Sequence, residues 1–351
     1  MSRIVFADDG IEFDGKTPEN GPLGGVESSV VNLMEELAGR GHEVLVRNMC
    51  AAPLVHKGVD WAPIHSDRPY GNMPEQADLY IANRGDKLID LMPKAGRSVF
   101  WIHNPASFLL KWRYLKKLWK VRPAIIFIGD YHATTYPRWA PAGERIVIPY
   151  GIPDLFRDAE PGTQIPGPRA VFTSNPLRSL DWLLEQWQHH IQPKVPGAEL
   201  HVFSGAATYG AVGAGKAKAM DKVLEQARAL EDKGVVLRGP VAKAQLVEEF
   251  RQARVLLYRG DINETFCLAV GEAQAMGVPG VVENLGSVSE RVIDGKTGYV
   301  ADSEIGFTSS AVSLLNDDDL WQTQHQAALQ SQRRWGWPEA AMEFEKLIAQ
   351  V

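Results

Sequence analysis

Two glutamates with a fixed spacing are the residues of this sequence best suited to chemistry. Glu264 and Glu272 enclose seven mostly small or apolar residues in the run ETFCLAVGE, which continues as AQAMGVPGVV. The segment predicts the first turns of a buried helix that Gly277 ends. Glu264 suits a helix N-terminus, because partial positive charge gathers there. Glu272 lies about two turns further on, where an unpaired charge would be costly, so we expect a polar partner for it.

Parallel strands must position these glutamates. The chain alternates short β-branched runs with amphipathic helical stretches, which predicts a doubly wound parallel α/β fold. A connection rich in proline and glycine interrupts the alternation at residues 151–168. We therefore expect two Rossmann-like halves with a cleft between them. The expected strands are 3–7, 43–47, 79–83, 98–102, 124–128 and 145–149, then 170–174, 200–204, 235–239, 255–258 and 280–282.

Composition limits the class of protein. The 351 residues are 45% hydrophobic and 23% charged, which excludes disordered and fibrous classes and suits two domains. The net charge of −6 argues against a nucleic-acid partner. Cys50 and Cys267 are the only cysteines, too few for a disulfide framework or a zinc site. This cysteine usage makes a reducing cytoplasm the expected location. No apolar run approaches the ~20 residues of a membrane span.

The loop before Glu264 predicts an anion site. In open parallel sheets ligands bind beyond the carboxyl ends of strands, and Arg259 follows one such end. The backbone N–H groups of a helix N-terminus bind phosphate. If a nucleotide diphosphate docks there, Glu264 faces the group on one side and Glu272 accepts from sugar hydroxyls on the other. The alternative is a helix with an acid at its N-terminus and one glutamate paired with a structural arginine. The expected donor-binding amides are those of Thr265, Phe266, Cys267 and Leu268.

These motifs resemble the retaining glycosyltransferases of the GT-B fold, especially glycosyltransferase family 4. The run from Glu264 to Glu272 is similar to the family's E-x7-E signature. Five further motifs follow the family's order: GPLGGVE (21–27), HNP (103–105), IPYGI (148–152), RSLDWLLEQW (178–187) and DGKTGYV (294–300). The resemblance implies an N-terminal acceptor domain at 1–155, a nucleotide-sugar domain at 156–330, and a C-terminal helix at 331–351 that crosses back to the N-terminal domain.

The resemblance also implies roles for the C-terminal half. Glu272 would hold the ribose of the nucleotide and Glu264 would contact the donor sugar. Arg178 would supply a cation to the diphosphate, where charge grows as the glycosidic bond breaks. The family commonly has a second cation about five residues earlier, and the sequence TSNP at 173–176 offers none. Arg259 is the candidate substitute.

In the N-terminal half the resemblance points to a histidine and a glycine pair. His103 ends a predicted strand and would contact the donor sugar, although an isolated histidine of this kind can equally be a buried one satisfied by backbone. Gly24 and Gly25 permit close approach of a ligand and positive φ, so they are expected to cradle phosphate or acceptor rather than form a mere turn. Tyr150 stands where the family usually has asparagine.

The predicted function is therefore a retaining, metal-independent glycosyltransferase without a cofactor. Its donor would be a UDP- or GDP-sugar and its acceptor a hydroxyl of a glycan, polysaccharide or lipid-linked molecule. Asp8-Asp9 and residues 317–319 lack the setting of a metal-binding DxD pair. A GT-B-fold nucleotide-sugar epimerase and a catalytically silent nucleotide-sugar-binding protein stay open as alternatives. A dinucleotide dehydrogenase is disfavoured, because no G-x-G-x-x-G follows the first strand.

A basic segment predicts an anionic partner. Residues 111–122, KWRYLKKLWKVR, carry six basic residues and no acid. A helical wheel places Arg113, Lys116, Lys117 and Lys120 on one face and Trp112, Leu115, Leu118 and Trp119 on the other. The expected partner is an anionic membrane at its inner face or a phosphorylated lipid-linked or polysaccharide acceptor. The alternative is that the tryptophan face packs on the sheet while the lysines are only solvated.

Overall fold

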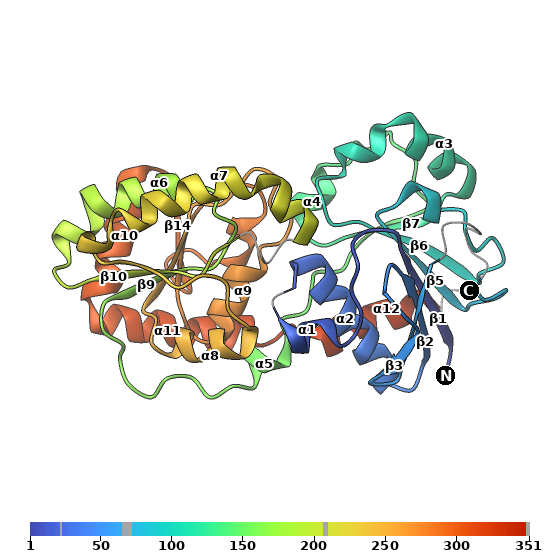
Figure 1. Cartoon of the computed structure of the whole chain (residues 1–351), viewed down its shortest axis with the longest axis horizontal. Helices are drawn as coiled ribbons and strands as arrows, with labels where there is room; N and C mark the ends of the chain where they lie inside the picture. The colour runs from blue at the N-terminus through green and yellow to red at the C-terminus, as the bar shows by residue number, and fades with distance from the viewer. Residues whose placement is uncertain (22, 65–71, 206–209, 349–351) are drawn as a thin grey trace. The chain divides into compact units, whose positions relative to one another are not determined.

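The fold consists of two α/β units (Figure 1). The computed structural model describes the chain except residues 22, 65–71, 206–209 and 349–351. Unit 1 comprises Met1–Gly151 and Trp337–Val351, and unit 2 comprises Ile152–Gly336. Each unit is built on one largely parallel sheet, so the predicted fold class is confirmed. The chain passes between the units at residues 151–152 and again at 336–337.

Unit 1 contains an eight-stranded sheet in the order β3-β4-β2-β1-β5-β6-β7-β8. Strand β1 pairs in parallel with both β2 and β5, and its residues from Ile4 to Asp8 are all buried. All six strands expected in this half are present. The bounds are β1 Arg3–Asp8, β2 Glu43–Asn48, β3 Leu54–His56, β4 Val59–Pro63, β5 Leu79–Asn83, β6 Arg97–Trp101, β7 Ala124–Phe127 and β8 Arg145–Val147.

The edge hairpin β3–β4 was not predicted from the sequence. It is the antiparallel pair of an otherwise parallel sheet. Its two-residue turn, Lys57 and Gly58, has φ of 45° and 80°, the geometry of a turn with positive φ at both central positions. Asparagine or aspartate commonly precedes glycine in such turns, and the lysine here concealed the signal.

The helices of unit 1 are α1 (Thr17–Asn20), α2 (Gly25–Gly39), α3 (Trp112–Val121), α4 (Asp130–Thr134) and α12 (Trp337–Ile348). Although α12 ends the described chain, it packs on α2 within unit 1. The carboxylate of Glu345 accepts hydrogen bonds from Arg40 and His42. Phe344 packs edge-on against Trp101 with a ring separation of 5.4 Å.

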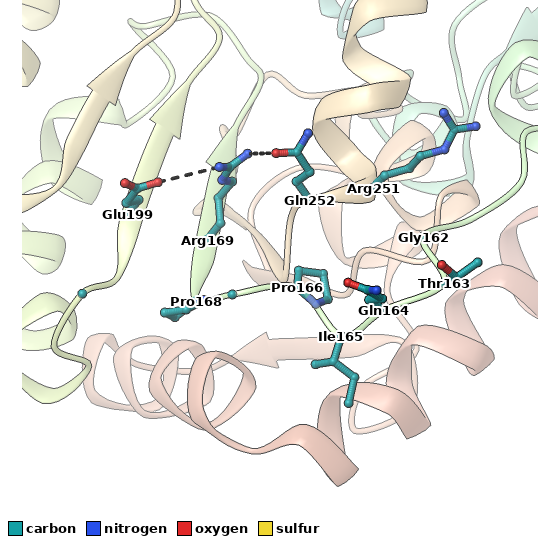
Figure 2. Close-up of a pocket in the computed structure, with 12 residues that line it drawn as sticks. Gly162, Thr163, Gln164, Ile165, Pro166, Pro168, Arg169, Glu199, Arg251 and Gln252 are labelled. Carbon is teal, nitrogen blue, oxygen red and sulfur yellow. Dashed lines mark hydrogen bonds and ion pairs between the residues drawn. The ribbon is translucent and has the colours of Figure 1, made fainter.

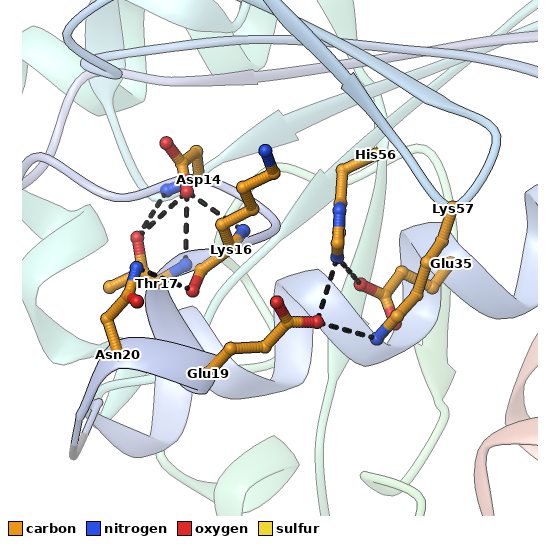
Figure 3. A network of polar contacts seen from close by, with 8 residues as sticks. All are labelled: Asp14, Lys16, Thr17, Glu19, Asn20, Glu35, His56 and Lys57. Atoms are coloured by element: carbon orange, nitrogen blue, oxygen red, sulfur yellow. Dashed lines mark hydrogen bonds and ion pairs between the residues drawn. The ribbon is translucent and has the colours of Figure 1, made fainter.

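A polar network fixes the short helix α1 before the glycine-rich loop (Figure 3). The carboxylate of Asp14 accepts from the backbone N–H and the hydroxyl of Thr17. Glu19 at the end of α1 lies 3.2 Å from His56 and 3.7 Å from Lys57 of the β3–β4 hairpin. Glu35 of α2 meets the same two side chains. The network therefore ties α1 and α2 to the sheet edge.

Unit 2 contains a six-stranded parallel sheet in the order β11-β10-β9-β12-β13-β14. Helices α6 and α7 lie on one side of it and α8 and α9 on the other (Figure 1). The strand β14 was not predicted, because it lies in the motif DGKTGYV, which reads as a turn. The strands are β9 Arg169–Phe172, β10 Glu199–Val202, β11 Val235–Leu237, β12 Val255–Tyr258, β13 Gly280–Glu283 and β14 Gly298–Ala301. The helices are α5 Asp154–Arg157, α6 Leu180–Gln186, α7 Gly210–Arg228, α8 Lys243–Arg251, α9 Leu268–Ala275, α10 Glu304–Asn316 and α11 Asp318–Gln332.

Helix α3 corrects the expected apolar face of residues 111–122. Leu115 and Leu118 are buried as predicted, but Trp112 and Trp119 are exposed and contact each other at 6.0 Å. Tyr114 is the further residue that α3 buries. Within the described residues no helix is both long enough and apolar enough to cross a bilayer.

Candidate functional site

The candidate site of unit 2 lies where the strand order reverses. Strands β9 and β12 are neighbours, but the chain leaves them toward opposite sides of the sheet, through α6 and α9. Loops diverge from the carboxyl ends of such a strand pair, and ligands bind in the opening that they leave. The loop after β9 reaches Ser179, whose hydroxyl donates to the carbonyl of Gly260 after β12 at 3.3 Å. The loops that carry RSLDWLLEQW and E-x7-E, two of the three motifs of this half, therefore meet at one place.

Arg178 and Glu264 form an ion pair at this point. The hydroxyl of Tyr258, the last residue of β12, donates to the same carboxylate oxygen at 2.9 Å. Burial and the charge of Glu264 both raise the pKa of Tyr258, so this hydroxyl stays protonated and remains a donor. Burial alone would lower the pKa of Arg178. Its interactions with Glu264 and Tyr258 together outweigh burial, so the pKa lies above its usual value. The arrangement holds one fixed cation beside a carboxylate that is 9% exposed.

Glu272 has the polar partner that its position in a buried helix required. Lys243, the first residue of α8, contacts its Oε1 oxygen. The same ammonium group lies 5.8 Å from the centre of the Phe156 ring, a cation–π distance. Glu272 itself is only 5% exposed. Sequence reasoning missed Lys243, because 29 residues and a strand separate it from Glu272 and no local pattern links them.

Helix α9 begins later than the sequence suggested. Its first residue is Leu268, and Glu264 lies before it in a turn where its N–H bonds the carbonyl of Asp261 at 2.9 Å. Thr265 and Phe266 also precede the helix. Cys267 occupies the N-cap with φ of 66°, a left-handed conformation that side chains rarely adopt. The expectation that residues 264–267 form helical turns is therefore wrong.

The start of α9 still presents backbone donors. A helix leaves its first N–H groups without partners inside the helix, here beginning with that of Leu268. The N–H of Val270 bonds to the sulfur of Cys267. Burial raises the pKa of that thiol well above its usual value, so it stays neutral. The helix start remains suited to an anion, with fewer amides than the sequence implied.

Arg259, the candidate second cation, is held within unit 2. Its Nε donates to Glu283 at 3.0 Å, and its guanidinium lies 4.7 Å from the centre of the Trp182 ring. Trp182 in turn donates to Glu304. These contacts place Arg259 on the loop directly after β12 and connect it to β13 rather than to Glu264.

A second strand reversal lies in unit 1, between β1 and β5. Asp8 ends β1 and is fully buried, and Asn83 ends β5. Arg84 contacts Asp8 at 3.4 Å and Glu27 of α2 at 2.8 Å, with φ of 47° at its own backbone. Burial raises the pKa of Asp8, although the Arg84 guanidinium opposes this. The Arg84 guanidinium thus pairs with two buried carboxylates. It lies at the carboxyl ends of β1 and β5, where a ligand of unit 1 would bind.

His103 belongs to a hydrogen-bonded chain in unit 1. The amide nitrogen of Asn83 donates to Asp8 at 2.9 Å, so its oxygen accepts from Nε2 of His103 at 2.5 Å. The Nδ1 nitrogen therefore accepts from the hydroxyl of Tyr150, also at 2.5 Å. Burial, followed by the charge of Arg84, lowers the pKa of His103 well below its usual value. The ring is neutral with the proton on Nε2, and a side-chain contact to a sugar would have to replace one of these bonds.

The glycine pair stands at the start of α2. Gly24 is the N-cap residue with φ of −59°, so it does not use the positive φ that was expected. A side chain there would collide with the carboxylate of Glu27. Gly25 is the first residue of the helix. The absence of a side chain at Gly24 thus leaves room for the carboxylate of Glu27, which in turn pairs with Arg84.

A hollow in unit 2 lies away from these residues (Figure 2). Arg169 and Glu199, the first residues of β9 and β10, line it together with the segment 162–168. It therefore opens at the amino ends of the strands, whereas Arg178 and Glu264 follow carboxyl ends. Because ligands of such sheets bind at the carboxyl ends, we do not assign the donor to this hollow.

Comparison with known proteins identifies the unit that carries the site. Residues 167–317 match the family model of the glycosyl transferases group 1. The matched residues make up most of unit 2. The match includes the loops after β9 and β12, and therefore Arg178, Glu264 and Glu272 together with the unpredicted Lys243.

Curated relatives align with this chain over part of their length. A D-inositol 3-phosphate glycosyltransferase of Xylanimonas cellulosilytica is 31% identical over 119 residues, 33% of this chain and 28% of the relative. A lipopolysaccharide 1,2-N-acetylglucosaminetransferase of Salmonella typhimurium is 26% identical over 138 residues, 37% of this chain and 35% of the relative. The aligned part thus spans about a third of each relative or less.

Solved structures of the same architecture cover both units. Sucrose-phosphate synthase from Thermosynechococcus elongatus has a TM-score of 0.73 at 15% identity, over 99% of this chain and 98% of that one. Anabaena Alr3699/HepE, solved in complex with UDP and glucose, has a TM-score of 0.73 at 14% identity and covers all of both chains. At this identity the similarity establishes the fold, which is GT-B.

Proposed function

We propose that this protein is a retaining, metal-independent glycosyltransferase that moves a sugar from a nucleotide-sugar to a hydroxyl acceptor. The observation that carries the proposal is the joining of Arg178, Glu264 and Tyr258 at the strand reversal of a group 1 glycosyltransferase unit. A fixed cation and a protonated hydroxyl there surround a carboxylate that is nearly buried. This is a site prepared for charged, polyhydroxylated ligands.

The donor would bind along the start of α9. Its diphosphate would lie against the first N–H groups of the helix and the guanidinium of Arg178. Glu264 would accept from hydroxyls of the transferred sugar. Lys243 holds Oε1 of Glu272, and we assign Oε2 of that carboxylate to a ribose hydroxyl. Arg259 lies on the same loop and is the remaining candidate for a contact with the nucleotide.

The reaction would break the bond between the anomeric carbon and the phosphate oxygen. Negative charge grows on that phosphate, and Arg178 with the helix N-terminus would stabilise it in place of a metal ion. The acceptor oxygen would bond to the same face of the anomeric carbon, and its proton would pass to the departing phosphate. A chelator should therefore leave turnover unchanged, whereas loss of activity with EDTA and recovery with Mg²⁺ would refute metal independence.

Unit 1 would bind the acceptor, a hydroxyl of a glycan, polysaccharide or lipid-linked molecule, at the carboxyl ends of β1 and β5. Glu27, Asn83 and Arg84 lie there, and Gly24 and Gly25 begin the helix that supplies Glu27. His103 would act as a positioning residue through its bonds to Asn83 and Tyr150. We expect the enzyme to act in the cytoplasm.

A thermal-shift panel of UDP-, GDP-, ADP- and CDP-sugars tests the donor. A ligand well above its Kd raises the melting temperature measurably. We expect UDP-sugars to raise the melting temperature most and GDP-sugars second most, because a protein of this fold has been solved with UDP-glucose. Product analysis with the stabilising donor then separates the functions: a glycoside supports transfer, a changed free nucleotide-sugar indicates an epimerase, and binding without turnover indicates a silent binding protein.

A further inference from the structure

The tryptophans that the structure leaves exposed gather on one surface of unit 1. Trp112 is 68% exposed, Trp119 49% and Trp139 67%, and every other tryptophan is at least half-buried. The rings of Trp112 and Trp119 contact each other, and Trp119 and Trp139 line one shallow hollow with Arg122 and Arg138. Single exposed apolar side chains are common on protein surfaces. Three exposed tryptophans that lie together indicate an interaction site.

Basic side chains surround these rings. Among the described residues Arg113 and Lys117 pair with the acids Asp86 and Asp90 of the neighbouring segment. The remaining cations of residues 111–122 and of the loop at Trp139 are exposed, and no ion pair joins them to a described acid. They are Lys111, Lys116, Lys120, Arg122 and Arg138. We call these five cations and the three tryptophans the tryptophan–basic surface.

The packing of α3 prevents these rings from turning inward. Leu118 is fully buried, and Tyr114, 6% exposed, donates its hydroxyl to the carbonyl of Arg84 at 3.2 Å. The helix therefore buries the arc that contains these two residues, with Trp112 and Trp119 beyond its edge. The ion pairs of Arg113 and Lys117 hold the helix in the same orientation. The exposed tryptophans are thus fixed features of unit 1.

We propose that the tryptophan–basic surface docks the protein on an anionic membrane leaflet. Tryptophan favours the water–lipid interface, because its ring is apolar and its N–H is polar. Lysine and arginine beside it are attracted to anionic headgroups. The chain as a whole carries a net charge of −6, so attraction to such a surface must come from a local patch. This inference stands on α3 and the loop at Trp139, and it is independent of the glycosyltransferase proposal.

Co-sedimentation of the full chain with vesicles tests the docking. One set contains phosphatidylcholine alone and the other phosphatidylcholine with phosphatidylglycerol at about 7:3. The test variant is Lys111→Glu/Lys116→Glu/Lys120→Glu. The matched control reverses three exposed lysines of α7 in unit 2, as Lys216→Glu/Lys218→Glu/Lys222→Glu, with the same change in net charge.

We expect wild type and the α7 control to sediment with the phosphatidylglycerol vesicles and to be released at high salt. The α3 variant should partition about a hundredfold less, since each cation near such a surface contributes about fivefold. The tryptophan emission should shift to shorter wavelength on binding, and Trp112→Ala/Trp119→Ala should reduce that shift. Equal recovery in the supernatant with both vesicles overturns the proposal. So do equal losses in the two lysine variants, or binding to soluble heparin without binding to vesicles.

Discussion

Replacing Phe344 by alanine should destabilise unit 1 strongly, although this residue lies seven positions from the end of the chain. Phe344 is 1% exposed and packs edge-on against Trp101 of β6. Loss of a buried phenylalanine costs about 3–5 kcal/mol through lost transfer free energy and the cavity left behind. We expect about 3 kcal/mol here, at the lower end of that range. Met342→Ala on the same helix, where the side chain is 42% exposed, should cost less than about 0.5 kcal/mol.

Hydrogen exchange of the β6 amides, from 99 to 101, measures this effect within unit 1. The free energy of opening should fall by the stated amount in Phe344→Ala and change little in Met342→Ala. Equal effects of the two substitutions, or a loss below about 1 kcal/mol in Phe344→Ala, would refute the claim that α12 completes the core of unit 1.

Three further outcomes follow from the polar contacts. Arg84→Ala should lower the stability of unit 1 by about 3–5 kcal/mol in urea unfolding, because two buried carboxylates lose their shared cation, and a loss under 1 kcal/mol would contradict this. Burial lowers the pKa of His103 well below its usual value and that of His132 to about 4. The unfolded chain therefore binds protons first, and the free energy of unfolding should fall as pH drops from about 6.5 toward 4, by up to about 1.4 kcal/mol per pH unit for each histidine; a flat profile would exclude neutral burial. Lys243→Ala should weaken binding of the stabilising nucleotide-sugar about tenfold in calorimetry, because Glu272 loses the partner that orients it, and an unchanged Kd would argue against that role.

The alternation of strands and helices was predictable because it is local. Most parallel strands consist of a short apolar run, although β4 and β14 do not show this pattern clearly, and the E-x7-E spacing marked the loop after β12. The start of α9 was not predictable in this way, because the conformation of Cys267, with φ of 66°, ends the preceding loop without a glycine. Lys243 was not predicted as the partner of Glu272 for a different reason. Only the folded structure brings the start of α8 close to Glu272.

Helix α3 shows how a helical wheel fails by one residue. The expected apolar face contains Trp112, Leu115, Leu118 and Trp119 and does not include Tyr114. Tyr114 is buried and lies on the far side of Leu118 from the tryptophans. Including it moves the centre of the buried arc toward Leu118 and leaves both tryptophans outside. A tyrosine that can reach a backbone carbonyl with its hydroxyl packs as well as an apolar residue, as its bond to Arg84 shows.

Turnover by Arg178→Ala tests the central claim most directly. The matched control is Arg169→Ala. Arg169 begins strand β9, whereas Arg178 follows the carboxyl end of that strand, so the two residues lie at opposite ends of β9. Release of nucleoside diphosphate from the stabilising nucleotide-sugar would be measured with acceptor present. We expect Arg178→Ala to lose about two orders of magnitude in rate while keeping its fold, and Arg169→Ala to retain nearly all activity. Near wild-type turnover in folded Arg178→Ala would contradict the proposed donor site.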